Sequence, residues 1–207
     1  VIPLEEAVAV NDQKSLRAAM LNVLKGEIRN SLSAISLALE TKDSESSHYA
    51  ASILSHELSE FRMEVQKLYL GIREEAQEQT EYEDMMLGYT DNVLKQKVFT
   101  ELEQRRFVQM MAEAAESFYT KNPSGMPEQH YESVCMRLLE IKDYENSEKW
   151  CIRLAEQYPD RLSAFTCKLK LYFIVRNREA FFQTLDALKK SNVVIDSETL
   201  ELIRTFS

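Results

Sequence analysis

Glycine and proline are scarce in this sequence, with four of each among 207 residues. Tight hairpin turns draw heavily on glycine, proline and Asn-Gly pairs, so this supply cannot support a β-sandwich or barrel with many hairpins. Strong helix formers such as leucine, alanine, glutamate, methionine and lysine are abundant instead. The composition therefore predicts an all-α protein.

Positive charge and long apolar runs are also lacking. The chain has 25 Lys and Arg against 34 Asp and Glu, which gives a formal net charge of −9 at pH 7. This charge repels the phosphate backbone, so nucleic acid is disfavoured as a partner. No apolar run reaches the roughly 20 residues that a transmembrane helix needs, and no signal-peptide pattern opens the chain. We therefore expect a cytoplasmic location. Because the chain starts at Val1 rather than Met, we expect it to be part of something longer, with any membrane anchor upstream.

The residues that could carry catalysis or bind a cofactor are sparse. A phosphate-binding loop needs clustered glycines, but the four here are isolated from one another: Gly26, Gly71, Gly88 and Gly125. Three cysteines, an odd number, fit a reducing compartment better than a disulfide framework. We expect all three to pack in the core, as free cysteines usually do. We predict no enzyme activity and no cofactor.

Two histidines give the best case for a metal site. His48 and His56 lie eight residues apart on one helical face, with Glu57 and Glu60 nearby. Structural zinc needs closer ligand pairs and further ligands. We therefore predict surface histidines and no metal site, and we keep a helical metal-dependent enzyme as the alternative of a different class.

The clearest repeat in the sequence lies in its C-terminal part. We align the sequence with the 34-residue tetratricopeptide pattern by setting Pro159 at position 32. Small residues then fall at positions 8 and 20, where the paired helices approach closely. Large residues fill most of the remaining core positions. From position 4 to position 27 these residues are Tyr131, Val134, Cys135, Leu138, Tyr144, Ser147, Cys151 and Leu154. Helix starts are expected near Asp12, Asp43, Asp143, Asp160 and Asn177, whose side chains can cap a helix.

A second copy follows 34 residues later. It places Phe165, Leu169 and Tyr172 on its first helix. With a turn one residue shorter, Ala180, Thr184 and Ala187 take positions 20, 24 and 27. Residues 127–191 thus resemble two repeats of the tetratricopeptide family, with a closing helix near residues 198–205. Residues 82–94 and 99–119 are predicted to form a further helical pair that extends the solenoid.

The N-terminal part repeats with a different period. An offset of 31 residues brings Asp12 onto Asp43 and Ala19 onto Ala50. This offset predicts two helical hairpins that resemble HEAT repeats, with a four-helix bundle as the alternative. The acidic stretch over residues 74–84 marks the boundary. We therefore expect an α-solenoid of antiparallel hairpins, HEAT-like or bundle-like over residues 1–77 and tetratricopeptide-like over residues 78–207.

The family resemblance implies a function for the first helix of each repeat. In tetratricopeptide arrays these helices line a concave groove, with partner contacts at positions 2, 5, 9 and 12. The corresponding residues here are Gln129, Glu132, Met136, Leu139, Ser163, Thr166, Lys170 and Phe173. Glu132 and Met136 replace the cations and amides of the carboxylate-binding subgroup, and Met136, Leu139 and Phe173 favour a helical or apolar partner segment. Alternatively, Leu139 and Phe173 pack against the preceding helices.

A second resemblance covers the whole chain. The opening VIPLEEAVAVNDQKSLRAAMLNVLKG and the later TKDSESSHYAASIL resemble the cytosolic part of the PelE family of membrane proteins of Pel-type exopolysaccharide synthesis. The resemblance implies a scaffold at the cytosolic face of a bacterial inner membrane, with a cytosolic glycosyltransferase or a cyclic-di-GMP receptor as partner. A free cytosolic regulator that binds peptides is the other scaffold hypothesis.

Overall fold

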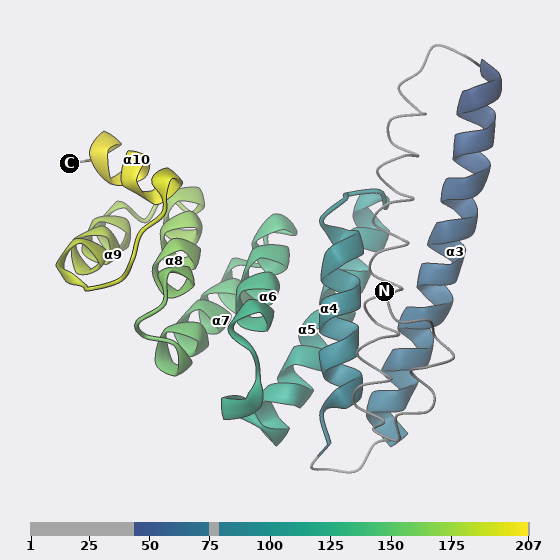
Figure 1. The fold of residues 1–207 in the computed structure, drawn as a ribbon, viewed down its shortest axis with the longest axis horizontal. Coiled ribbons are helices and arrows are strands. Elements are labelled where there is room, and N and C mark those ends of the chain that lie inside the picture. The colour runs from purple at the N-terminus through teal and green to yellow at the C-terminus, as the bar shows by residue number, and fades with distance from the viewer. Residues whose placement is uncertain (1–43, 75–78, 207) are drawn as a thin grey trace, which may run out of the picture. The chain divides into compact units, whose positions relative to one another are not determined.

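The computed structural model describes residues 44–74 and 79–206, and side chains from residue 51 onward (Figure 1). Within those residues all regular structure is helical, which confirms the all-α prediction. The helices are α3 (Ser44–Glu74), α4 (Glu81–Leu94), α5 (Glu101–Lys121), the short 3-10 helix η1 (Pro123–Gly125), α6 (Glu128–Glu140), α7 (Tyr144–Gln157), α8 (Leu162–Ile174), α9 (Arg178–Lys190) and α10 (Ser197–Thr205).

The chain divides into two compact units. Among the described helices, unit 1 contains α3 and α4, and unit 2 contains α5 to α10. The division between consecutive helices falls after Phe99, whereas the predicted domain boundary lies between residues 77 and 78. The grouping differs because α4 packs against α3. Residues 82–94 therefore belong with the N-terminal unit and are not grouped with residues 99–119.

Unit 1 is held together by one apolar face of α3. Phe61, Val65 and Leu68 are buried, and their spacing of four and three residues places them on one side of a helix. The ring of Phe61 stacks on Tyr89 of α4, with ring centroids 5.4 Å apart. This face binds α4 to α3 through burial of apolar surface.

The N-terminal hairpin expected to start near Asp43 is wrong, because residues 44–74 form one continuous helix of 31 residues. The stretch contains no proline, and its one glycine, Gly71, lies near the end, so nothing in it breaks the helical ladder. The matching hairpin expected to start near Asp12 lies outside the described residues. The same holds for the predicted helix starts at Asp12 and Asp43.

Unit 2 contains two helical hairpins whose turns have the same geometry 34 residues apart. Lys142 ends the turn after α6 with φ 64°, and Arg176 does the same after α8 with φ 58°. The next residue in each turn caps the following helix: the Asp143 side chain accepts from the N–H of Asn146, and the Asn177 side chain accepts from the N–H of Ala180. The predicted caps at Asp143 and Asn177 are therefore confirmed.

Two details of the predicted repeat are wrong. The second turn is as long as the first, so Phe181, Leu185 and Leu188 are the buried residues of α9, in place of Ala180, Thr184 and Ala187. The reason is that the two N-caps are equivalent. Asn177, the N-cap of α9, follows the end of α8 by the same number of residues as Asp143, the N-cap of α7, follows the end of α6. In addition, Asp160 stands near the start of α8 as predicted, but the N-cap of this helix is Arg161 and no side chain caps it.

The first hairpin of unit 2 packs around an aromatic cluster. Tyr131 of α6 is fully buried and lies edge-on to Trp150 of α7, with ring centroids 5.8 Å apart. Tyr119 of α5 contacts both rings. The ring centroid of Tyr158 lies 5.9 Å from that of Tyr131. The Tyr158 hydroxyl donates to the Met126 carbonyl oxygen at 2.8 Å. Edge-on aromatic pairs of this kind add specificity to apolar burial.

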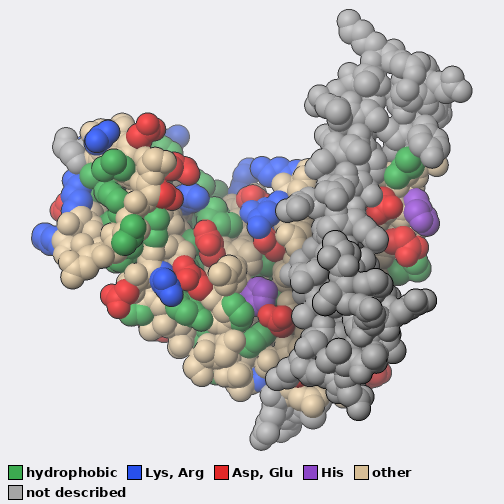
Figure 2. Space-filling view, in the orientation of Figure 1, with side chains coloured by type: hydrophobic (Ala, Val, Ile, Leu, Met, Phe, Trp, Pro, Cys, Tyr) green, Lys and Arg blue, Asp and Glu red, His purple; other side chains and the backbone are tan. Residues whose placement is uncertain are grey.

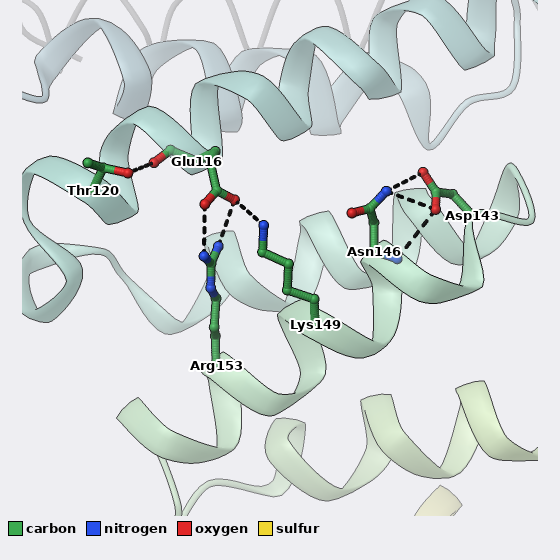
Figure 3. A network of polar contacts seen from close by, with 6 residues as sticks. All are labelled: Glu116, Thr120, Asp143, Asn146, Lys149 and Arg153. Atoms are coloured by element: carbon green, nitrogen blue, oxygen red, sulfur yellow. Dashed lines mark hydrogen bonds and ion pairs between the residues drawn. The ribbon is translucent and has the colours of Figure 1, made fainter.

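A charged network joins α5 to α7 (Figure 3). The Glu116 carboxylate accepts two hydrogen bonds from the Arg153 guanidinium, at 2.7 and 2.8 Å, and one from Lys149 at 2.8 Å. The guanidinium also lies over the ring of Tyr119, 3.9 Å from its centroid. Paired hydrogen bonds between arginine and a carboxylate fix orientation as well as charge, so this network sets how α7 lies on α5.

Candidate protein-interaction surface

The surface with the most features of a binding site lies where α6, α8 and α10 meet in unit 2. The helices α6 and α8 pack against each other, and residues from the start of α10 line the same hollow. A hollow of about 390 Å³ remains between the three helices, which is within the range of ligand pockets. Its lining residues are Glu128, Glu132, Leu162, Ser163, Thr166, Leu169, Lys170, Asp196, Glu198, Thr199 and Leu202.

One carboxylate of the hollow is held in place by its neighbours. The Ser163 hydroxyl, at the start of α8, donates to Glu128 Oε1 at 2.7 Å. Arg161 Nε lies 3.5 Å from the other carboxylate oxygen. Because Glu128 is in the first turn of α6, its charge is also favoured by the helix dipole. The position of this side chain is therefore fixed by α6 and α8 together.

A second carboxylate is held by α10. Asp196 is the N-cap of this helix, and its side chain accepts from the N–H of Thr199 at 2.7 Å. This hydrogen bond is the main reason why the pKa of Asp196 lies below its usual value. Thr199 itself is buried, which anchors the first turn of α10 on the unit. Asp196 is therefore ionised at the edge of the hollow at neutral pH.

The hollow combines an acidic rim with apolar surface. Four carboxylates line it and one ammonium group, that of Lys170, accompanies them. Leu162, Leu169 and Leu202 supply its apolar part. On the face of unit 2 drawn in Figure 2, acidic side chains lie among hydrophobic ones over α6, α8 and α10. Such a surface can hold a cation that also carries apolar groups.

The structure brings together half of the predicted groove residues. Glu132, Ser163, Thr166 and Lys170 all line the hollow. The four others are not among its lining residues: Gln129, Met136, Leu139 and Phe173. Gln129 is exposed and Met136 is half-buried.

Leu139 and Phe173, for which core packing was the alternative, differ in how much of each side chain is exposed. Leu139 is 5% exposed, which agrees with packing against neighbouring helices. Phe173 is 62% exposed, although its ring lies 6.1 Å from Phe181 and 6.4 Å from Phe206. Phe173 thus contacts an aromatic cluster at the end of unit 2 whose Phe181 is buried, while its own ring remains largely open to solvent.

The contribution of α10 to this surface was not predicted. The closing helix was predicted, but Asp196, Glu198, Thr199 and Leu202 were not assigned to the binding surface. Asp196 followed by Thr199 has the spacing of an N-cap and the amide it binds, which could have located the start of the helix. Only the folded chain shows that this start lies beside α8.

The three buried thiols form the other cluster of reactive groups. Cys135, Cys151 and Cys167 lie on α6, α7 and α8 and all are buried and free. Burial raises the pKa of the Cys135 thiol well above its usual value, and hydrogen bonds with the other two thiols raise it further. A thiol in this state is a poor nucleophile, so the cluster behaves as core.

The described residues also lack the features of a metal site and of a membrane span. They contain no group of three or more His, Cys, Asp or Glu residues placed to hold a metal ion. His56 is exposed on α3, and the side chain of His48 lies outside the described part. None of the described helices has both the length and the apolar character to cross a membrane.

Comparisons with known proteins returned no relative. No family model, no curated protein and no solved structure matches this chain.

Proposed function

We propose that this protein is a non-catalytic protein-interaction scaffold of tetratricopeptide-like hairpins that helps to assemble a bacterial membrane exopolysaccharide synthase. The single observation that carries the proposal is the 34-residue recurrence of the α6–α7 and α8–α9 hairpins, with the same turn geometry and the same side-chain cap in both. Stacked helical pairs of this kind commonly present a continuous binding surface.

The surface chemistry of unit 2 agrees with a protein partner. It offers the hollow between α6, α8 and α10 and, at the end of the unit, the exposed ring of Phe173. Exposed aromatic residues are enriched in protein interfaces. The catalytic and cofactor motifs sought in the sequence are not present, which favours binding over chemistry.

The exopolysaccharide part of the proposal rests on the sequence resemblance to the PelE family. The segments that carry it, at residues 1–26 and 41–54, lie mostly outside the described side chains. The resemblance also supplies the location, the cytosolic face of an inner membrane, and the partners, a cytosolic glycosyltransferase or a cyclic-di-GMP receptor. The net charge of −9 agrees with a protein rather than a nucleic acid as partner.

Co-purification with defined partners tests the proposal. The tagged chain is mixed with the purified Pel-type glycosyltransferase or cyclic-di-GMP receptor from the same genome, and complexes are measured by size-exclusion chromatography. We expect one of them to bind, and the paired Met136→Glu and Phe173→Glu changes to weaken binding by about 2 kcal/mol or more, as for loss of an apolar anchor. Ile152→Glu on α7, which changes another exposed apolar residue, is the matched control.

Two results would each contradict one part of the proposal. If neither partner binds the wild-type chain, the role in exopolysaccharide synthase assembly is wrong. If a partner binds equally well to the paired variant, with circular dichroism showing an intact fold, Met136 and Phe173 do not belong to the binding surface, and that part of the proposal is wrong.

A further inference from the structure

We propose that the hollow between α6, α8 and α10 binds a basic segment of a partner protein, in which a lysine or arginine is flanked by an apolar residue. This inference rests on the proposed scaffold function and names the chemistry of one partner segment.

The charge of the hollow sets the sign of its ligand. Glu128, Glu132, Asp196 and Glu198 line it against the single Lys170. Ser163 and Arg161 contact Glu128, and the N–H of Thr199 contacts Asp196, so these two carboxylates are held on opposite helices. Glu132 and Glu198 make no hydrogen bond or ion pair with the described residues. A cationic group entering between α6 and α10 would therefore meet two carboxylates that no side chain of the described part pairs with.

The shape of the hollow argues against a bare ion. The carboxylates come from α6 and α10, and within the described part no three acidic groups are placed to hold one metal ion. The surface between them includes Leu162, Leu169 and Leu202. A lysine or arginine side chain has the matching character, since its methylene stem can cover apolar surface while its charged head reaches the rim.

The same composition favours a peptide over a nucleic acid or a plain polyamine. Phosphates would be repelled by the four carboxylates, and a polyamine offers no apolar side chain for the leucines. A segment with alternating basic and apolar residues satisfies both parts of the hollow. Charge complementarity of this kind also accelerates association and makes it sensitive to salt.

Fluorescence anisotropy with a labelled short peptide that alternates lysine and leucine tests the inference on the full purified chain. We expect this peptide to bind, with affinity falling as salt rises. Two comparison peptides, with glutamate in place of lysine or serine in place of leucine, should bind much more weakly. Spermidine should compete poorly, because it fills only the charged part of the site.

Variants of the rim make the test specific. The double change Glu132→Gln and Glu198→Gln should lower the affinity about tenfold, since each exposed charge contact contributes up to about 1 kcal/mol. Lys170→Gln should raise the affinity about twofold to fivefold for the same reason. The matched control is Glu145→Gln with Glu156→Gln, which removes two exposed charges of α7 outside the hollow and should leave binding unchanged.

The outcomes separate this inference from the scaffold function. Failure of the lysine-leucine peptide to bind, equal binding by the rim variant, or equal competition by spermidine would overturn the basic-segment site. If the rim variant still binds the glycosyltransferase or the cyclic-di-GMP receptor normally, the scaffold function stands and this site is wrong. If the peptide results hold but neither protein binds, the site stands and the exopolysaccharide role is wrong.

Discussion

The Ser147 hydroxyl on α7 donates to the backbone carbonyl oxygen of Cys135 on α6 at 3.0 Å. Both residues are only 1% exposed. The contact is possible because a small side chain stands at each position, so the two helix backbones approach closely and the buried hydroxyl is satisfied. Cys135 and Ser147 take positions 8 and 20 of the predicted repeat. The tetratricopeptide alignment requires the residues at these two positions to lie in contact.

Enlarging Ser147 should separate the two helices. We expect Ser147→Leu to lower the free energy of unfolding of unit 2 by about 1 to 3 kcal/mol through overpacking. Ser147→Ala, the matched control, removes only the hydroxyl and should cost no more than about 1 kcal/mol. Urea unfolding followed by the fluorescence of Trp150, the single tryptophan of the chain, reports on α7 directly. Equal stability of the two variants would contradict close packing at this position.

The two repeated turns should gain stability from glycine. Lys142 and Arg176 hold positive φ angles, which cost a residue with a side chain about 1 kcal/mol relative to glycine. The N–H of Lys142 and that of Asp143 bond to Leu139 and Leu138 carbonyl oxygens at 3.1 and 3.0 Å, a helix ending in which glycine is the usual residue.

Lys142→Gly is therefore expected to raise the free energy of unfolding by up to about 1 kcal/mol, and Arg176→Gly by a similar amount. Lys142→Val should lower it, since a β-branched side chain is strained at positive φ. The same urea titration measures all three. If the glycine variants are less stable than wild type, the positive φ angles are not a source of strain in these turns.

Gly71 is required for the contact between α3 and α4 in unit 1. A Cβ at this position would lie 2.5 Å from the ring of Tyr82. We expect Gly71→Ala to destabilise unit 1 by about 1 kcal/mol, because overpacking of 1 to 3 kcal/mol outweighs the gain in helix propensity. In a thermal melt followed by circular dichroism, Tyr82→Ala should remove this penalty. A stabilising Gly71→Ala change in the wild-type background would contradict the contact.

The sequence was sufficient to predict the helical class, the first hairpin and its close contact. These features depend on local signals: few glycines and prolines, caps at Asp143 and Asn177, and small residues at Cys135 and Ser147. The length of the second turn was not predicted correctly, because apolar residues occur at adjacent positions of α9. Ala180 with Phe181 and Thr184 with Leu185 fit a helical period equally well, and only packing selects one set.

The candidate site was predicted in part for a related reason. Glu132, Ser163, Thr166 and Lys170 follow from helical spacing once the repeat is aligned. The contribution of α10 depends on where the chain returns after α9, which no periodicity encodes. Long-range ion pairs are likewise not encoded by any periodicity. Glu116 and Arg153 are 37 residues apart, and neither residue stands out in the sequence.

The Glu116–Arg153 pair makes the stability of unit 2 depend on pH. The hydrogen bonds from Arg153 are the main cause that lowers the pKa of Glu116 from 4.5 to about 2. A carboxyl group with a lower pKa in the folded state stabilises the fold when it is ionised. Its contribution is therefore complete above about pH 4.5, the unfolded value, and is lost as the pH falls to about 2.

We expect Glu116→Gln to lower the free energy of unfolding at pH 7 by about 1 kcal/mol, a modest value because the carboxylate is 42% exposed and solvent screens the pair. The difference between variant and wild type should shrink as the pH falls from 4.5 to 2, and high salt at pH 7 should reduce it. Urea titrations of Trp150 fluorescence at each pH measure it, with Glu156→Gln on α7 as the control for loss of an exposed charge. A difference that does not change between pH 7 and pH 2 would mean that Glu116 acts through packing, because only the ionised carboxylate holds Arg153 and Lys149.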